Sequence, residues 1–291
     1  MAEGAKANWL LLKSKELPPC DGPKLGMFAH CRAPIEWLEL LQKSTPESQS
    51  GSQGFVFKVK ILSQVYALKV FKFYKPSTER HLMSDIDGQK VTDNDLAFHT
   101  DPFYAECRAY GRIKIAEKAR RRQIAARCHG FIPLKRKDEL FLAEMGIDPW
   151  EDIPEDDEYR IQAEGSPIRA IVKDFIDVEG DDSMDLRTLK GIVKNVRAMN
   201  KHGILHRDIR AANFRAGLIV DFGSAWTKPH CIMAVVPPHL FKRWELDDLS
   251  MFEDMVEEQG FSLLSVRALP DQSYLRKLRS RKRVWRFEDE R

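Results

Sequence analysis

The stretch from residue 206 to residue 223 constrains this chain more than any other. The tripeptide His206-Arg207-Asp208 is followed five residues later by Asn213, and Asp221-Phe222-Gly223 comes soon after. Carboxylate and amide oxygens are the ligands that Mg²⁺ prefers, and a carboxylate can also accept a proton from a hydroxyl group. Together, the two tripeptides in this order predict a compact loop, strand and loop unit suited to phosphoryl transfer from a magnesium-bound nucleotide.

The bulk properties are those of an ordinary globular protein. The chain has 291 residues, of which 43% are hydrophobic and 31% charged, and its formal charge of +3 is too small to imply direct nucleic-acid binding. Five scattered cysteines without C-x-x-C spacing argue against a disulfide framework or a zinc site. No apolar run approaches the roughly 20 residues that a membrane helix needs. We therefore expect an intracellular protein of the cytoplasm or nucleus.

Charge and histidine positions add two minor expectations. An acidic stretch spans residues 148–158 and a basic tail spans residues 276–283. Both are interpreted as solvated segments, with a nuclear-import or acidic-partner patch as the alternative for the tail. His99 and His129 are interpreted as surface or satisfied polar residues.

The first half of the chain reads as strand-rich. Residues 1–34 are rich in proline and lack periodicity, which indicates a loosely packed arm. Residues 75–100 are polar without a clear period and are interpreted as an insertion. A helix is predicted from Phe103 to Lys118. Strands are predicted at residues 37–41 (with a short helix as the alternative), 55–59, 66–71, 124–133, 140–143 and 168–176.

The second half reads as mostly helical. Apolar residues at spacings of three and four predict a helix over residues 186–201, which Gly203 ends, and residues 249–256 could form one more helix. The expected fold class is α+β, with a cleft between two lobes. The expected domains are an N-terminal arm (1–34), a strand-rich N-lobe with insertions (35–178), a reduced helical C-lobe (179–265) and a basic tail (266–291).

Over roughly residues 36–260 the chain resembles the protein-kinase-like fold. The blocks YALKVF, FYAECRAYGR and AIVKDF also resemble a fungal family of kinase-like proteins that includes a kinetochore-associated subunit. The resemblance implies a two-lobed protein-kinase-like fold with ATP and Mg²⁺ as cofactors. It also implies a protein substrate or partner.

The N-terminal half supplies the expected nucleotide contacts. Gly51 and Gly54 would let backbone N–H groups close over the phosphates, because neither carries a Cβ. By resemblance, Lys69 would bind the phosphates and Glu106 would hold that lysine as its ion-pair partner. The resemblance places further contacts around the adenine, namely Val56 and Ala67 as an apolar roof and the backbone from Asp174 to Ile176 at the edge.

The second half supplies the expected chemistry. Asp208 would orient or deprotonate the accepting hydroxyl group, and Asn213 and Asp221 would ligate magnesium. Arg210 would neutralise charge on the transferring phosphoryl group. The segment Asp247-Asp248-Leu249-Ser250 resembles the start of the central C-lobe helix of kinases, and its aspartate is interpreted either as a brace for the catalytic loop or as a helix N-cap.

The chain departs from the kinase pattern at several points. Gln49 replaces the first glycine of G-x-G-x-x-G, residues 214–220 form a short connection, and no A-P-E motif follows Gly223. Three functions stay open. The first is an ATP- and Mg²⁺-dependent phosphotransferase that acts on protein serine or threonine. The second is a non-catalytic kinase-like scaffold in a chromosome-associated or other complex. The third is a small-molecule kinase.

Overall fold

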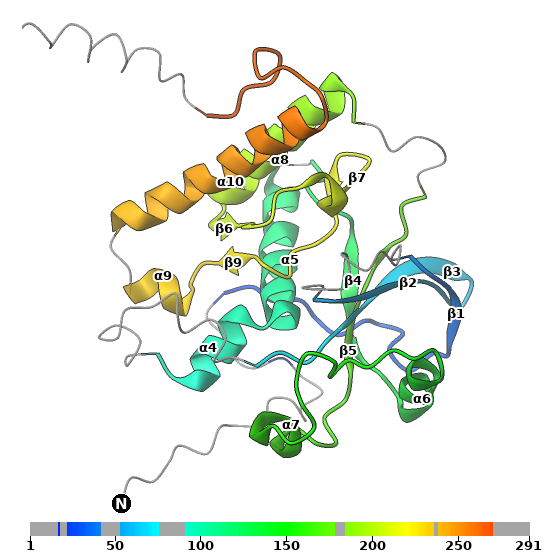
Figure 1. Ribbon diagram of the computed structural model, residues 1–291. Helices are drawn as coiled ribbons and strands as arrows, with labels where there is room; N and C mark the ends of the chain where they lie inside the picture. Colours follow the sequence, from blue (N-terminus) through cyan, green and yellow to red (C-terminus); the bar gives the residue numbers. More distant parts are fainter. Residues whose placement is uncertain are drawn as a thin grey trace, which may run out of the picture.

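The computed structural model has a mixed α and β fold (Figure 1) and describes residues 17, 22–41, 53–75, 91–120, 122–177, 184–235 and 238–269. The strands are β1 (Ile35–Leu40), β2 (Gly54–Ile61), β3 (Gln64–Phe71), β4 (Cys128–Pro133), β5 (Arg169–Asp174), β6 (Ile204–Leu205), β7 (Phe214–Arg215), β8 (Leu218–Ile219) and β9 (Trp226–Thr227). The helices are α4 (Asp93–Thr100), α5 (Pro102–Arg120), α6 (Arg136–Glu144), α7 (Glu158–Gln162), α8 (Leu186–Lys201), α9 (Cys231–Val235) and α10 (Pro238–Glu258).

The main sheet has five antiparallel strands in the order β1-β2-β3-β5-β4. Side chains alternate between its faces, so that Phe57, Leu68 and Val172 share one buried core with Leu142 of α6. The opposite face carries Lys69, which pairs with Val56 on β2 and with Ile171 on β5. This second face is the one that meets the candidate site.

Helix α5 stands between the sheet and helices α8, α9 and α10 in Figure 1, and it contacts both β5 and β9. The larger core gathers around it, with Tyr110 and Phe222 packed edge to face at 5.0 Å. Helix α8 buries the face predicted from its spacing and begins at Asp185, whose carboxylate accepts a hydrogen bond from the amide of Thr188. Helix α10 packs against α8.

The predicted helix at residues 186–201 is confirmed, as is the helix from Phe103. The strands predicted at 37–41, 55–59, 66–71 and 168–176 are also present, with the observed bounds given above. The strand predicted over residues 124–133 begins only at Cys128. No helix of the described ranges is both long and apolar enough to cross a membrane.

One prediction of secondary structure is wrong, and two others missed part of a helix. Residues 140–143 lie in helix α6, because a short apolar run fits a helix and a strand equally well. The supposed insertion at 75–100 contains helix α4, which Thr92 caps by accepting a hydrogen bond from the amide of Asp95. The last helix begins at Pro238, well before residue 249, since proline is well tolerated in the first helical turn.

The described part of the predicted arm is closely packed. Leu25 and Phe28 are buried, and their amides donate hydrogen bonds to the carbonyl oxygens of Cys107 and Phe131. Gly130 adopts a φ of +150°, and a Cβ there would lie 2.5 Å from the backbone nitrogen of Phe28. The interpretation of residues 22–34 as loosely packed is therefore wrong. Residues 1–16, the linker at 180–183 and most of the basic tail lie outside the described residues.

The buried ion pair between Asp101 and Arg169 joins the start of α5 to β5. The two charged groups are 2.9 Å apart, and Asp101 also accepts a hydrogen bond from the amide of Phe103. We expect Asp101→Asn to destabilise the protein by about 3–5 kcal/mol, because it leaves the Arg169 guanidinium buried without a counter-charge. Urea unfolding measures this difference.

The matched control is Glu36→Gln, which removes the exposed ion pair of Glu36 with Lys60. It should change the free energy of unfolding by less than about 1 kcal/mol. Equal effects from the two substitutions would contradict the structural importance of the buried pair.

Candidate functional site

The centre of the site is a buried lysine between two carboxylates. Lys69 of β3 places its Nζ 3.0 Å from Oε2 of Glu106 on α5 and 2.6 Å from Oδ1 of Asp221. Lys69 is 2% exposed and Glu106 is fully buried. The structure thus brings together three of the predicted site residues, and the predicted pairing of Lys69 with Glu106 is present.

A second buried lysine shares this cluster. Lys173 of β5 donates from Nζ to Oε1 of Glu106 at 2.7 Å and to the carbonyl oxygen of Val220 at 2.7 Å. It lies opposite Ala67 in the sheet, on the same face as Lys69. The sequence analysis missed Lys173, although a lysine inside a mostly apolar strand is itself a sign of a buried charge that needs a partner.

The charges of the cluster shift the pKa values of Asp221 and Lys69. Burial alone would raise the pKa of Asp221, but the charges of Lys69 and Lys173 outweigh it and hold that pKa well below its usual range. Burial alone would lower the pKa of Lys69, but Asp221 and Glu106 reverse the effect and raise it. Lys69 and Asp221 therefore remain an ion pair at neutral pH.

Asp208 lies in a loop held by side chains from its own segment. Asn213, in the 3-10 turn η2 (Ala211–Asn213), donates from Nδ2 to the Asp208 carbonyl oxygen at 2.8 Å and to Oδ2 at 2.9 Å. Nε of Arg210 lies 3.2 Å from Oδ1 of Asp208, and both side chains reach solvent. The predicted catalytic residues Asp208 and Arg210 therefore form an exposed ion pair, with the predicted magnesium ligand Asn213 beside them.

Asp248 braces this loop from helix α10. It is 1% exposed and accepts hydrogen bonds from the amides of His206 and Arg207, both at 2.8 Å. Nδ2 of Asn200 donates to the same carboxylate at 2.7 Å. Asp248 lies inside α10, so its interpretation as an N-cap is wrong and its interpretation as a brace is confirmed. Arg207 adopts a positive φ of 65° at this point.

The predicted adenine roof is interrupted by charge. Val56 and Ala67 are half-buried and lie on the sheet face that carries Lys69. Lys58 pairs with Ala67 on that face, and its ammonium lies 4.4 Å from the centre of the Phe175 ring. An ammonium group thus stacks on an aromatic ring next to the predicted apolar surface.

The other predicted nucleotide contacts already have partners within the chain. The Asp174 amide donates to the carbonyl oxygen of Arg127, and its carboxylate lies 2.6 Å from His129 Nε2. Ile176 follows β5 and is half-buried. A Cβ at Gly54 would lie 2.2 Å from the carbonyl oxygen of Val70, so β3 alone requires this glycine. Gly51 lies outside the described residues.

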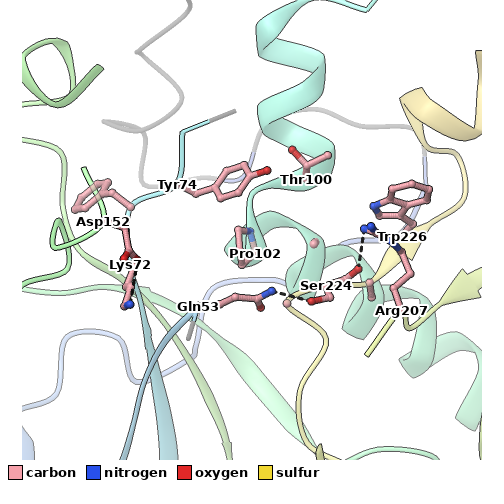
Figure 2. A pocket seen from close by; sticks show the side chains of 13 residues that line it. Gln53, Lys72, Tyr74, Thr100, Pro102, Asp152, Arg207, Ser224 and Trp226 are labelled. Atoms are coloured by element: carbon pink, nitrogen blue, oxygen red, sulfur yellow. Dashed lines mark hydrogen bonds and ion pairs between the residues drawn. The ribbon is translucent and has the colours of Figure 1, made fainter. Parts of the chain in front are cut away.

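Gln53, which the sequence analysis did not single out, reaches across the site (Figure 2). Its Nε2 donates to Oγ of Ser224 at 2.8 Å. A Cβ built on Gly223 would lie 1.8 Å from Oε1 of Gln53 and 3.2 Å from Nζ of Lys69. The amide side chain therefore lies directly against Gly223, close to the Lys69 ammonium. No short sequence motif marks this contact, because it joins residues 171 positions apart.

A cavity of about 320 Å³ opens beside Gln53. Figure 2 shows its wall, to which Tyr74, Thr100, Arg207 and Trp226 contribute. None of the described residues predicted to bind the nucleotide or magnesium lines this cavity. This cavity thus lies beside the lysine and carboxylate cluster, whereas the predicted contact Asp174 lines a second cavity.

The charge cluster predicts a pH-dependent cost of removing Lys69. At pH 7 we expect Lys69→Met to destabilise the protein by about 3–5 kcal/mol, because it leaves buried carboxylates undercompensated. The pKa of Asp221 is lower in the folded wild-type protein than in the unfolded chain, where it is about 4. Ionised Asp221 therefore stabilises the folded protein at pH values above about 4, and this stabilisation is lost as the pH falls towards the folded-state pKa. Without Lys69, protonation relieves the buried charge, so the cost should shrink on acidification.

Urea unfolding of both proteins at pH 7 and at pH 3 tests this expectation. Lys60→Met, on the same sheet but with the exposed partner Glu36, is the control and should show a small difference at either pH. A cost of Lys69→Met that is the same at pH 3 and pH 7 would contradict the charge argument.

Comparison with known proteins identifies the family. A family model described as kinetochore Sim4 complex subunit FTA2 matches residues 13–226. A search of curated proteins finds no match. The matched residues make up well over half of the chain and include Lys69, Glu106, Asp208 and Asp221. The chain therefore belongs to the family described as kinetochore Sim4 complex subunit FTA2.

Proposed function

We propose that this protein is a nuclear subunit of a kinetochore complex, in which a kinase-like body serves as a non-catalytic protein scaffold. Membership of the kinetochore family supports a role in a protein assembly. The function of the protein would then be to contact other proteins, and not to catalyse a reaction. The partner in this proposal is another protein of the complex.

The arrangement of the charge cluster supports the kinase-like part of the proposal. In protein kinases a lysine on the third strand pairs with a glutamate on a helix, and an aspartate that binds magnesium follows the catalytic loop. Lys69 on β3, Glu106 on α5 and Asp221 meet in that way. The five-stranded sheet and the region of α8 and α10, with α5 between them in Figure 1, are consistent with a two-lobed arrangement.

The observation that carries the non-catalytic proposal is the position of Gln53. By the resemblance, ATP phosphates would lie between the glycine-containing turn and Lys69. Gln53 lies against Gly223 and bonds to Ser224, and Lys69 already bonds to two carboxylates. A phosphate group would have to displace the Gln53 amide and compete for Lys69. The internal contacts thus perform the ordering that a nucleotide performs in an active kinase.

The segment after Gly223 supports the same conclusion. Helix α10 begins at Pro238. Between Gly223 and this helix, the described residues form only the short strand β9 and the five-residue helix α9. Protein kinases use the equivalent region to bind a substrate peptide and to regulate activity. A segment this short leaves little surface for a peptide substrate.

A second candidate function is magnesium-dependent phosphoryl transfer from ATP to a hydroxyl group. It is favoured by the complete set of groups, because Asp208, Asn213 and Asp221 all keep the residue types that the chemistry needs. Asp208 would orient the hydroxyl group, while Asn213 and Asp221 would hold the magnesium that neutralises the phosphates. The acceptor would be a protein serine or threonine or a small molecule.

Replacement of the cellular protein by Asp208→Asn separates the two functions. Asp208 is partly exposed, so this change should leave the fold intact. The scaffold predicts wild-type recruitment to the kinetochore and wild-type chromosome segregation, as for the control Asp254→Asn on the exposed face of α10. Loss of segregation with Asp208→Asn alone, together with loss of phosphate transfer by the purified protein, would establish the phosphotransferase instead.

A further inference from the structure

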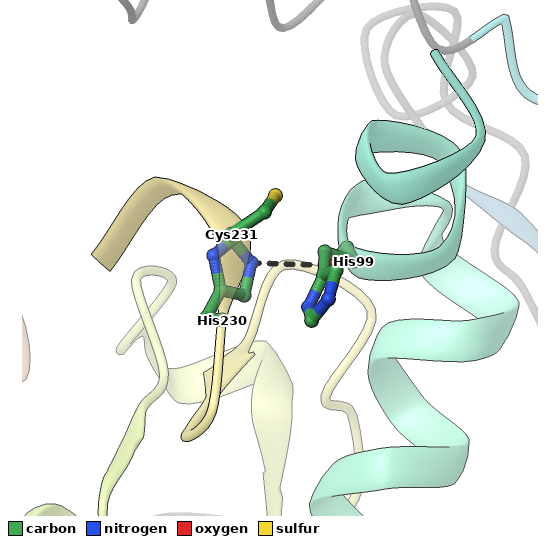
Figure 3. Close-up of side chains that lie close together, drawn as sticks. All are labelled: His99, His230 and Cys231. Carbon is green, nitrogen blue, oxygen red and sulfur yellow. Dashed lines mark hydrogen bonds between the residues drawn. The ribbon is translucent and has the colours of Figure 1, made fainter. Parts of the chain in front are cut away.

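Three side chains with metal-binding atoms meet away from the lysine and carboxylate cluster. His99, near the end of α4, faces His230 and Cys231 at the start of α9 (Figure 3). One ligand atom of each lies within 4.8 Å of the other two. Imidazole nitrogen and thiolate sulfur are the ligands that zinc takes in proteins. We propose that His99, His230 and Cys231 form a binding site for a zinc-class divalent metal ion.

The hydrogen bonds of His230 prepare it for this role. Its Nε2 lies 3.1 Å from the carbonyl oxygen of His99, and a carbonyl oxygen can only accept, so Nε2 carries the proton. Its Nδ1 therefore has the lone pair, which accepts a longer contact of 3.2 Å from the amide of Ile232. Metal-binding histidines characteristically donate their other ring N–H to a carbonyl or carboxylate group. A metal ion would take the place of the Ile232 contact at Nδ1.

His99 supplies the second, independent observation. Its Nδ1 is buried and has no hydrogen-bond partner among the described residues. A buried polar atom without a partner is uncommon, and an ion is one of its ordinary explanations.

Cys231 completes a nitrogen and sulfur set. A bound metal ion displaces the proton of its thiol, and the resulting thiolate offsets the charge of Arg108, which would otherwise oppose a cation. Arg108 is itself directed at the carbonyl oxygens of Thr227 and Pro229.

Aromatic packing accounts for only part of the arrangement. The His230 ring stacks on Trp226 with centroids 4.9 Å apart, and it meets His99 edge to face at 4.9 Å. This packing explains the plane of the His230 ring. It leaves both the partnerless nitrogen of His99 and the approach of the Cys231 sulfur unexplained.

A metal ion here would join two distant parts of the chain. It would connect α4 to the segment that follows Gly223, which carries Ser224 and Trp226 of the cavity wall. Zinc sites with three protein ligands keep a fourth position for water or another group. The site would therefore fix the short segment next to the charge cluster without using any residue of that cluster.

Titration of the reduced full-length protein with Co²⁺ tests the proposal. We expect one equivalent to bind, with the sulfur-to-cobalt charge-transfer band and the intense visible bands of a tetrahedral site, and one equivalent of Zn²⁺ to remove them. Cys231→Ser should abolish the charge-transfer band, and His99→Gln should weaken binding at least tenfold. The control Cys31→Ser, at a half-buried cysteine outside the cluster, should leave the spectrum unchanged.

A measurement on the wild-type protein keeps the test independent of variant folding. Zn²⁺ should slow alkylation of Cys231 at least tenfold while leaving the rate at Cys31 unchanged, as measured by mass spectrometry of peptides. The proposal is overturned if the wild-type protein gives no cobalt bands. Equal alkylation rates of Cys231 with and without Zn²⁺ would overturn it as well.

Discussion

The cluster of Lys69, Lys173, Glu106 and Asp221 is the interaction on which the rest of the structure depends. It joins β3, β5 and α5 to the loop that follows β8. Glu106 is fully buried and both lysines are nearly so, which is tolerable only because every charge has a counter-charge within hydrogen-bond distance. Loss of one member leaves another uncompensated. The cluster therefore fixes how the sheet, the central helix and the Asp221 loop lie together.

Two further contacts extend this order without a ligand. Asp248 holds the backbone of the 206–208 loop by two amide hydrogen bonds, and Gln53 ties the start of β2 to Ser224. In an active kinase, nucleotide and magnesium provide much of the equivalent ordering. In the proposed scaffold, the protein's own side chains would supply it. This would suit a subunit that contributes its surface to the assembly and does not use its cleft.

The sequence predicted the elements whose pattern is long and regular. Helix α8 has an apolar face repeated over four turns, and β3 and β5 are mostly apolar with β-branched residues, so their type could be inferred locally. Helix α6 could not, because Leu140–Ala143 is too short to distinguish a helix from a strand. The pairing of Lys69 with Glu106 was predicted from the kinase resemblance. Gln53 and the role of Lys173 were missed, because both depend on contacts between segments far apart in the chain.

Calorimetric titration of magnesium-ATP into the wild-type protein and into Gln53→Ala tests the central claim most directly. If internal contacts have replaced the nucleotide, the wild-type protein gives no binding heat at millimolar ATP. Removal of the Gln53 amide should then allow weak binding at most. Magnesium-dependent binding by the wild-type protein with a micromolar Kd would contradict the account. It would show that Lys69 and Asp221 bind a nucleotide and are not limited to stabilising the fold.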